Sequence, residues 1–572
     1  MPGSKPLLSS ALAVCLGSAF LVASCATPQT GGTGAAGTNG EAGTTGSAGH
    51  GGSTGSAGTT GTAGTTGSGG HAGSTGVAGT TGSAGTTGSA GTTGAAGTTG
   101  SAGTTGSAGT TGSAGTTGSA GTTGSAGTTG SAGTTGSAGA TGTGGAGIAS
   151  PPFDWIGVVG TGQSLSVGTT PASSTTQPYN NMMLSLNGAT VPGTGTNPWD
   201  STSTLLKMAP LVEPLRALQT TYPSPYPGNL YGETFHASMA NEITRSVKAA
   251  SSSADYVTVH TVVGESGQGI VALVKQTGST TGTTGRASAA TLFEVGAIDR
   301  LAKAASKSYG VGVIVMTHGE TDCNNSGYGD SVTQLLSDYN TEIAAITGQT
   351  YKIPMYLNQQ HGCPGAPACT ASSEVRPSVN NVEWQLGVQH PGQFVCTGPK
   401  YQYPCHSDGD GIHLNVTGYQ MLGEKIAEVY YQRAVLGNDW QPLMPTSVSR
   451  SGRNVTVNFH VPNPPLNWDS TFDAPVLTAW KNGKGFELFT STASVTITSV
   501  AISGNSVVIT AGADLPASDL NVGYALTSQG KQQSTHSKSV RWGQLRDSDP
   551  YMGGTTKMAN PNYAVSFSLP VP

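Results

Sequence analysis

Between residues 31 and 145 a glycine occupies every third position without exception, in units such as GTTGSAGTTGSA. Collagen triple helices need that period, because only glycine fits where three chains crowd around one axis. The segment contains no proline, however, and proline is what preorganises the backbone of a collagen chain. Thr and Ser, for instance in glycosylated form, would have to take its place. Expansion of a short DNA repeat would also produce such a pattern.

We therefore interpret residues 25–149 as a Gly/Thr/Ser/Ala-rich Gly-X-Y spacer, disordered or polyproline-like, with a trimeric collagen-like stalk as the alternative. The two forms differ in reach. A flexible coil of this length spans roughly 60 Å, whereas a fully extended stalk reaches about 350 Å. Only the stalk makes the chain a homotrimer, and neither form carries chemistry.

Residues 1–24 have the features of an export signal: Lys5 in a positive region, an apolar stretch from Leu7 to Val22, and small residues before Cys25. The ending LVASC resembles the lipobox of bacterial lipoproteins, whose cysteine is lipid-modified. This resemblance implies a lipoprotein signal peptide and attachment of Cys25 to a membrane. An ordinary secretory signal with an incidental cysteine is the alternative. Either way we expect an exported protein, anchored at the cell envelope or cell surface, or secreted.

The composition argues against several classes of function. The net charge is −5 with only 9% charged residues and no Lys/Arg cluster, so nothing indicates nucleic-acid binding. No run of about 18 apolar residues follows the N-terminus, so no membrane-spanning helix is predicted. No phosphate loop or dinucleotide fingerprint follows a strand, and we expect no cofactor. Asp408 and Asp410 lie in an acidic turn without the spacing of a calcium loop, so no metal site is predicted.

From Phe153 onward the pattern is that of a globular α/β domain, which we assign to residues 150–440. Apolar runs typical of buried strands cover residues 153–160, 256–263, 311–318 and 352–359. Between them, apolar residues recur at helical spacing at Leu292, Val295, Ile298, Leu301 and Ala305, and at Leu335, Leu336, Tyr339, Ile343 and Ile346. Strands that alternate with helices indicate a parallel sheet, and ligands bind such sheets beyond the carboxyl ends of the strands.

Four short motifs follow the predicted strands or open the last helix. They are GQSL at residues 162–165, GESGQG at 264–269, HGETD at 318–322 and DGIH at 410–413. Together they resemble the SGNH (GDSL-type) hydrolase family, most closely its carbohydrate-esterase branch, which includes acetylxylan and sialate O-acetylesterases. The resemblance covers roughly residues 153–437. It implies a three-layer α/β/α fold and hydrolysis of an acylated carbohydrate.

The motifs supply the parts of a serine hydrolase. Ser164 is the predicted nucleophile, because a serine hydroxyl beside a base can attack an ester carbonyl. His413 is the predicted base, and Asp410, three residues earlier in a tight turn, would orient its imidazole. Ser166 and Ser266 are competing nucleophiles, but neither fits the expected motif position. We therefore interpret Ser164, Asp410 and His413 as a catalytic triad.

The resemblance also implies donors for an oxyanion. These are the backbone N–H groups of Ser164 and Gly264, with Gly267 as a substitute for Gly264, and a side chain from the third motif. That side chain is usually Asn or Gln in the family, whereas here it is His318, whose strength as a donor would depend on pH. Glu320 is expected to order its loop by accepting hydrogen bonds.

Five cysteines lie in this domain, at positions 323, 363, 369, 396 and 405. Export permits disulfides. The short loops CPGAPAC and CTGPKYQYPC suggest the pairs Cys363–Cys369 and Cys396–Cys405, with Cys323 left over, although a sequence does not settle connectivity. The spacing matches no zinc site.

Residues 441–572 are expected to form an all-β, sandwich-like accessory domain. Residues 446–462 and 494–512 each have the pattern of a strand, a turn and a second strand. Three tryptophans of this region would suit sugar stacking, but packing in the core is their commoner use. They are Trp468, Trp480 and Trp542.

The sequence thus predicts an exported, lipid-anchored serine esterase that removes short acyl groups, acetyl above all, from carbohydrate. The alternative is a cell-surface adhesin or collagen-like structural stalk whose hydrolase-like domain only binds. The strict glycine period and the unusual His318 favour that alternative, and the polymer substrate is left open.

Overall fold

A computed structural model describes residues 87–89, 105–107, 151–169, 171–186, 199–216, 232–275, 284–362, 378–405, 412–472, 478–526 and 543–572. The chain divides into two compact units, residues 1–145 and 146–572. In the first unit, strands β1 (Thr87–Ser89) and β2 (Thr105–Ser107) pair in parallel. No helix in the described part of the chain is long and apolar enough to cross a membrane. Cys25 lies outside the described residues, so its lipid attachment stays a prediction.

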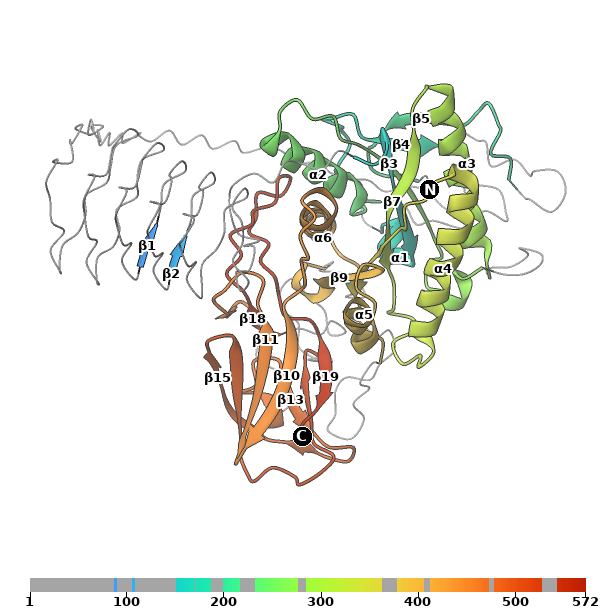
Figure 1. The fold of residues 1–572 in the computed structure, drawn as a ribbon. Helices are drawn as coiled ribbons and strands as arrows, with labels where there is room; N and C mark the ends of the chain where they lie inside the picture. Colours follow the sequence, from blue (N-terminus) through green and yellow to red (C-terminus); the bar gives the residue numbers. More distant parts are fainter. Residues whose placement is uncertain are drawn as a thin grey trace, which may run out of the picture. The chain divides into compact units, whose positions relative to one another are not determined.

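A seven-stranded sheet lies in the second unit, with the strand order β5-β4-β6-β3-β7-β8-β9 (Figure 1). Its strands are β3 (Trp155–Gly162), β4 (Met182–Ser185), β5 (Lys207–Pro210), β6 (Val257–Gly264), β7 (Tyr309–Thr317), β8 (Met355–Gln359) and β9 (Phe394–Pro399). Every neighbouring pair is parallel except β4 with β5 at one edge. The predicted parallel-dominated α/β sheet is confirmed, although β4, β5 and β9 were not predicted.

Helices cover both faces of this sheet. They are α1 (Ser164–Val167), α2 (His236–Ala250), α3 (Arg286–Ala304), α4 (Tyr328–Thr347), α5 (Ser378–Gln389) and α6 (Val416–Tyr430). Helices α2 and α6 pack together on one face, and α3 and α4 cover the other (Figure 1). In α3 the predicted Leu292 and Leu301 are only half-buried, because the buried stripe runs through Glu294 and Ile298. Glu294 is tolerated there because it pairs with buried Arg216.

Residues 444–570 form two four-stranded antiparallel sheets, ordered β10-β11-β16-β15 and β14-β13-β17-β19. The strands are β10 (Met444–Ser451), β11 (Asn454–His460), β13 (Phe486–Phe489), β14 (Ser494–Val495), β15 (Ile497–Ser503), β16 (Ser506–Ala511), β17 (Asn521–Tyr524) and β19 (Phe567–Pro570), with β12 (Asn467–Trp468) and β18 (Leu545–Arg546) as a separate pair. Both predicted hairpins are present, as β10–β11 and β15–β16. Trp480 is a core residue that donates to Leu488 O, Trp468 is half-buried, and Trp542 lies outside the described residues.

The all-β part and the α/β part share one hydrophobic core. The C-terminal segment also returns to the parallel sheet and to α6. Gln359, at the end of β8, donates to Ser566 O at 2.6 Å. Glu424 on α6 accepts from the backbone N–H groups of Thr555 and Thr556, at 2.6 and 2.8 Å. These bonds fix the carboxyl end of β8 and the position of α6, two elements that flank the candidate site.

Candidate active site

Ser164 is the first residue of α1, a single helical turn that begins directly after β3. The bend between them depends on Gly162, whose φ of +142° favours glycine. A Cβ atom at this position would lie 2.0 Å from Thr317 O, so the missing side chain also lets β3 and β7 end side by side. The turn leaves Ser164 5% exposed. The sequence GQS therefore fixes the serine at the carboxyl edge of the sheet.

His413 lies against this serine. Its Nε2 is 2.6 Å from Ser164 Oγ, although 249 positions separate the two residues. That distance is within the range for a nucleophile and its general base. When Nε2 carries no hydrogen, the hydroxyl is the donor and its proton points at the group that would take it. Of the competing serines, Ser166 is fully buried in α1 and Ser266 is half-exposed in the loop after β6.

The segment around His413 is tied down on its C-terminal side. Leu414 forms a β-bridge with Cys405, and Asn415 caps α6 with its side chain. His413 therefore directly precedes two fixed residues, the bridged Leu414 and the helix-capping Asn415. Asp410, the predicted third member of the triad, lies outside the described residues, so its role stays a prediction.

Gly264 ends β6 and is paired in register with Gly162, so the carboxyl ends of β6 and β3 lie side by side. Glu265 N–H donates to Gly162 O at 2.9 Å, which continues the pairing one residue beyond the strand. The backbone of Gly264 thus lies at the same sheet edge as Ser164. Gly267 lies in the exposed part of the loop that follows.

His318, just after β7, is buried with both ring nitrogens engaged. Nε2 lies 3.1 Å from Gln268 O, and Nδ1 lies 3.2 Å from Tyr328 OH. Because a carbonyl only accepts, Nε2 carries the hydrogen and Nδ1 accepts from the tyrosine. Burial lowers the pKa of His318, which favours this neutral form. Asp322 Oδ2 also accepts from Ile270 N–H at 2.5 Å, so the loop after β7 holds the loop after β6.

This arrangement bears on the predicted oxyanion hole. The Nε2–H of His318 is directed at Gln268 O, and a donor role toward an oxyanion would require that bond to break. In the structure His318 orders the loop that follows Gly264.

Glu320 is fully buried next to the ammonium group of Lys400 and the imidazole of His361. Its Oε1 lies 2.8 Å from Lys400 Nζ and 3.4 Å from His361 Nδ1. The pKa of Glu320 is about 2, because burial raises it but the charge of Lys400 and the contact with His361 lower it further. Lys400 and His361 were not predicted. Both lie within two residues of a strand end, after Pro399 and Gln359, and that position is the signal that would have selected them.

The predicted pairing of the cysteines is wrong in two respects. Cys396 is a free, buried thiol, so the Cys396–Cys405 disulfide is not formed, because β9 runs on in extended form beyond Cys396 and separates the two. Burial raises the pKa of Cys396 to about 12. Cys323, predicted to be left over, is disulfide-bonded. Cys363 and Cys369 lie outside the described residues.

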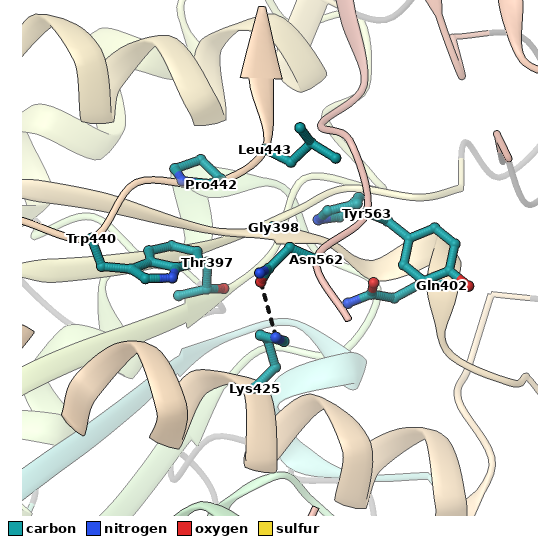
Figure 2. Close-up of a pocket in the computed structure, with 10 residues that line it drawn as sticks. Thr397, Gly398, Gln402, Lys425, Trp440, Pro442, Leu443, Asn562 and Tyr563 are labelled. Carbon is teal, nitrogen blue, oxygen red and sulfur yellow. Dashed lines mark hydrogen bonds between the residues drawn. The ribbon is translucent and has the colours of Figure 1, made fainter. Parts of the chain in front are cut away.

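A shallow recess, with essentially no room even for a water molecule, lies between the end of β9, α6 and the C-terminal segment (Figure 2). Its lining is Thr397, Gly398, Pro399, Gln402, Lys425, Trp440, Pro442, Leu443, Asn562 and Tyr563. Lys425 Nζ donates to Asn562 Oδ1 at 2.9 Å. Pockets that bind small molecules enclose about 300 Å³ or more. The recess is too small for such a ligand, and none of the predicted site residues lines it.

Part of the glycine-rich segment matches a known protein family. The collagen triple helix repeat, in 20 copies, matches residues 85–149. No curated protein matches the sequence. Among solved structures the chain is similar to a carbohydrate acetylesterase from Xanthomonas citri, with 11% identity and a TM-score of 0.42 over 72% of this chain and 80% of that one. It is also similar to a protein from Arabidopsis thaliana (16% identity, TM-score 0.32, 49% and 98% covered) and to NanS (9%, 0.31, 50% and 98%).

Proposed function

We propose that this protein is an exported serine esterase that hydrolyses short acyl esters, acetyl in particular, on carbohydrate. The observation that carries the proposal is the 2.6 Å approach of His413 Nε2 to Ser164 Oγ at the carboxyl edge of a parallel sheet. A serine hydroxyl becomes a nucleophile when such a base takes its proton. The carbohydrate substrate rests on the resemblance of the four sequence motifs.

The geometry fits a two-step acyl transfer. Ser164 Oγ attacks the acyl carbon while its proton moves to His413 Nε2. The tetrahedral intermediate collapses, the sugar oxygen leaves with that proton, and an acyl-serine remains. Water then gives a proton to the same nitrogen and attacks the acyl-serine. The bond between Ser164 Oγ and the acyl carbon breaks, Nε2 returns the proton to Ser164 Oγ, and the acid is released. Asp410, in this proposal, holds the imidazole and stabilises its charged form.

The developing oxyanion needs donors that are already in position. We assign the backbone N–H groups of Ser164 and Gly264, because Gly162 pairs with Gly264 and brings the two strand ends together. His318 supports them by holding Gln268 in the loop after Gly264.

An ester-hydrolysis assay tests the proposal. The purified protein is expected to release 4-nitrophenol from 4-nitrophenyl acetate without added metal, and the Ser164→Ala variant is expected to be inactive. A folded wild-type protein that turns over no short-chain ester would contradict the proposal. Release of acetate from acetylated xylan, sialic acid and peptidoglycan, compared side by side, identifies the natural substrate class.

Membrane attachment through Cys25 is part of the same proposal, supported by the LVASC sequence. Wild-type protein from the producing cell is expected to enter the detergent phase of a Triton X-114 partition, and Cys25→Ala protein the aqueous phase. Equal partition of the two proteins would contradict the proposed lipid anchor.

A second candidate function is a collagen-like stalk that carries the globular unit. It is favoured by the match of the collagen repeat to residues 85–149 and by the unbroken glycine period. A trimer in analytical ultracentrifugation, with the circular dichroism of a triple helix in the cold, is the expected result for the stalk. An elongated monomer would reject it. The esterase proposal is independent of this outcome, since a stalk can carry an active enzyme.

A further inference from the structure

Three buried polar side chains form a row along the carboxyl ends of β7, β8 and β9. Glu320 follows β7, His361 follows β8 and Lys400 follows β9, and none has exposed side-chain surface. The three strands are successive in the sheet, and Glu320 Oε1 lies close to both His361 Nδ1 and Lys400 Nζ. Buried polar groups of this kind need a compensating structural or functional reason.

His361 is the member of this row that reaches the candidate site. Its Nε2 lies 2.8 Å from the carbonyl oxygen of Ile412, the residue directly before His413. A carbonyl only accepts, so Nε2 is the donor. The carbonyl of Ile412 and the N–H of His413 belong to one rigid peptide plane. A bond to that carbonyl therefore fixes the orientation from which the His413 side chain starts.

We propose that His361 is a positioning residue for the hydrolytic site, which holds the Ile412–His413 peptide so that His413 Nε2 stays within reach of Ser164 Oγ. The inference rests on the proposed esterase function. On the other side of His413, Leu414 is held by its bridge to Cys405. The backbone is thus held both directly before and directly after His413. The contact before it, to Ile412 O, comes from the side chain of His361.

Glu320 and Lys400 lie on the side of the His361 ring that is opposite Ile412. The ring has two nitrogens, and a rotation that exchanged them would turn the donor N–H away from the carbonyl. Glu320 Oε1 lies 3.4 Å from Nδ1, and its charge is balanced by Lys400 at 2.8 Å. This ion pair lies on the Nδ1 side of the ring, and Ile412 O lies on the Nε2 side.

A positioning role predicts a specific kinetic pattern. Misplacement of a catalytic group by about 1 Å lowers the rate roughly a hundredfold. Substrate binding does not use His361, so the effect should fall on kcat and leave KM nearly unchanged. A side chain that is needed only for folding would lower the melting temperature without changing the kcat of the folded fraction.

The experiment compares three substitutions at one position. His361→Ala and His361→Leu remove the donor, and His361→Leu also fills the space, so that a folded donor-free variant is obtained if the alanine variant does not fold. His361→Gln keeps an amide N–H near the position of Nε2. The control is His260→Ala, since His260 is an equally buried histidine in the middle of β6. Each protein is assayed with 4-nitrophenyl acetate, and its melting temperature is measured by circular dichroism.

We expect the donor-free variants to lose about a hundredfold in kcat with KM within about threefold. His361→Gln should recover at least roughly tenfold of that loss. His260→Ala should melt earlier but keep a kcat within about threefold of wild type. Normal kcat in a folded donor-free variant would overturn the inference and leave the esterase function standing. An inactive wild-type protein would overturn the proposed function and this inference with it.

Discussion

Glu320 Oε1 lies 2.8 Å from Lys400 Nζ, and neither side chain has any exposed surface. Two charges buried in this way stabilise the fold only as a pair, because each alone would be stripped of water. The pKa of Glu320 is about 2, since the charge of Lys400 and the contact with His361 outweigh the effect of burial. The carboxylate therefore remains charged down to strongly acidic pH.

This pair predicts loss of stability in acid. The folded pKa of about 2 lies below the ordinary 4.5, so the contribution is complete above pH 4.5 and is lost as the pH falls toward 2. We expect that loss to approach about 3 kcal/mol in the free energy of unfolding. Glu320→Gln should be less stable at neutral pH by about 3 to 5 kcal/mol, because Lys400 is left without its partner. Urea unfolding at several pH values measures both. A difference between variant and wild type that does not shrink below pH 4.5 would contradict the pair's role.

A second acid-sensitive pair lies between α2 and β6. His236 Nδ1 and His260 Nδ1 are 2.9 Å apart, and both rings are fully buried. Thr258 Oγ1 donates to Asn181 Oδ1 at 2.9 Å, so it accepts from His260 Nε2 at 3.0 Å. The hydrogen between the two rings is therefore on His236. Both histidines are neutral, and a proton added to either would place a charge in the core.

These histidines predict an earlier loss of stability than Glu320 does. Burial lowers the pKa of His260 to about 3 from the ordinary 6.5. The unfolded chain thus takes up the proton first, so stability is complete above pH 6.5 and falls as the pH decreases below it. We expect about 2 kcal/mol to be lost by about pH 5 from this residue alone. His260→Gln has no such proton to take up, and its unfolding free energy should vary less between pH 6.5 and 5. Parallel curves for the two proteins would reject the explanation.

Gly162 is predicted to tolerate no side chain. A Cβ there would meet Thr317 O at 2.0 Å, at a φ of +142°. Gly162→Ala should lower the free energy of unfolding by roughly 3 kcal/mol or more and reduce kcat, because the clash displaces Ser164. Gly348→Ala is the matched control: its φ is +76° and nothing lies within 4 Å of the added carbon. It should cost about 1 kcal/mol and leave kcat unchanged. Equal effects of the two substitutions would show that the clash is relieved without moving the serine.

His318 gives a choice between two roles. Because its Nε2–H is bonded to Gln268 O, we expect His318→Ala to loosen the loop after β6, with a higher KM and a lower melting temperature. An oxyanion donor would behave differently, with roughly a hundredfold loss in kcat and little change in either of the others. Steady-state kinetics and thermal melts of His318→Ala and His318→Gln decide between the two roles.

The central strands could be predicted because strands buried on both faces appear in sequence as unbroken apolar runs. β7 is the clearest case, and β3, β6 and β8 are also rich in apolar residues although polar residues interrupt β6 and end β8. The strands that were missed, β4, β5 and β9, lie at or near the sheet edges, and β9 contains Gly398 and Pro399, which interrupt its apolar run. Edge strands carry less hydrophobic signal, so a pattern of apolar residues does not find them.

Only part of the candidate site could be predicted from the sequence, for a related reason. Ser164 and His413 stand in short motifs beside predicted elements, and the resemblance of those motifs to a hydrolase family selects them. Lys400 does not, because a lysine in a sequence is by default a surface residue. Its burial beside Glu320 depends on β7, β8 and β9 being successive strands of the sheet, which a sequence does not reveal. The hydrogen-bond partners of His318 likewise depend on the packing of two loops.

The double-mutant comparison of Ser164 and His413 tests the central claim most directly. Ser164→Ala and His413→Ala are each expected to lower kcat by up to about a million-fold, because a nucleophile and its base act as one unit. Asp410→Asn should retain more activity than either, and Ser166→Ala and Ser266→Ala should stay within roughly tenfold of wild type. The predicted result is a Ser164→Ala/His413→Ala double variant hardly slower than each single variant. Near-normal turnover by Ser164→Ala, with loss of activity in Ser266→Ala, would contradict the account.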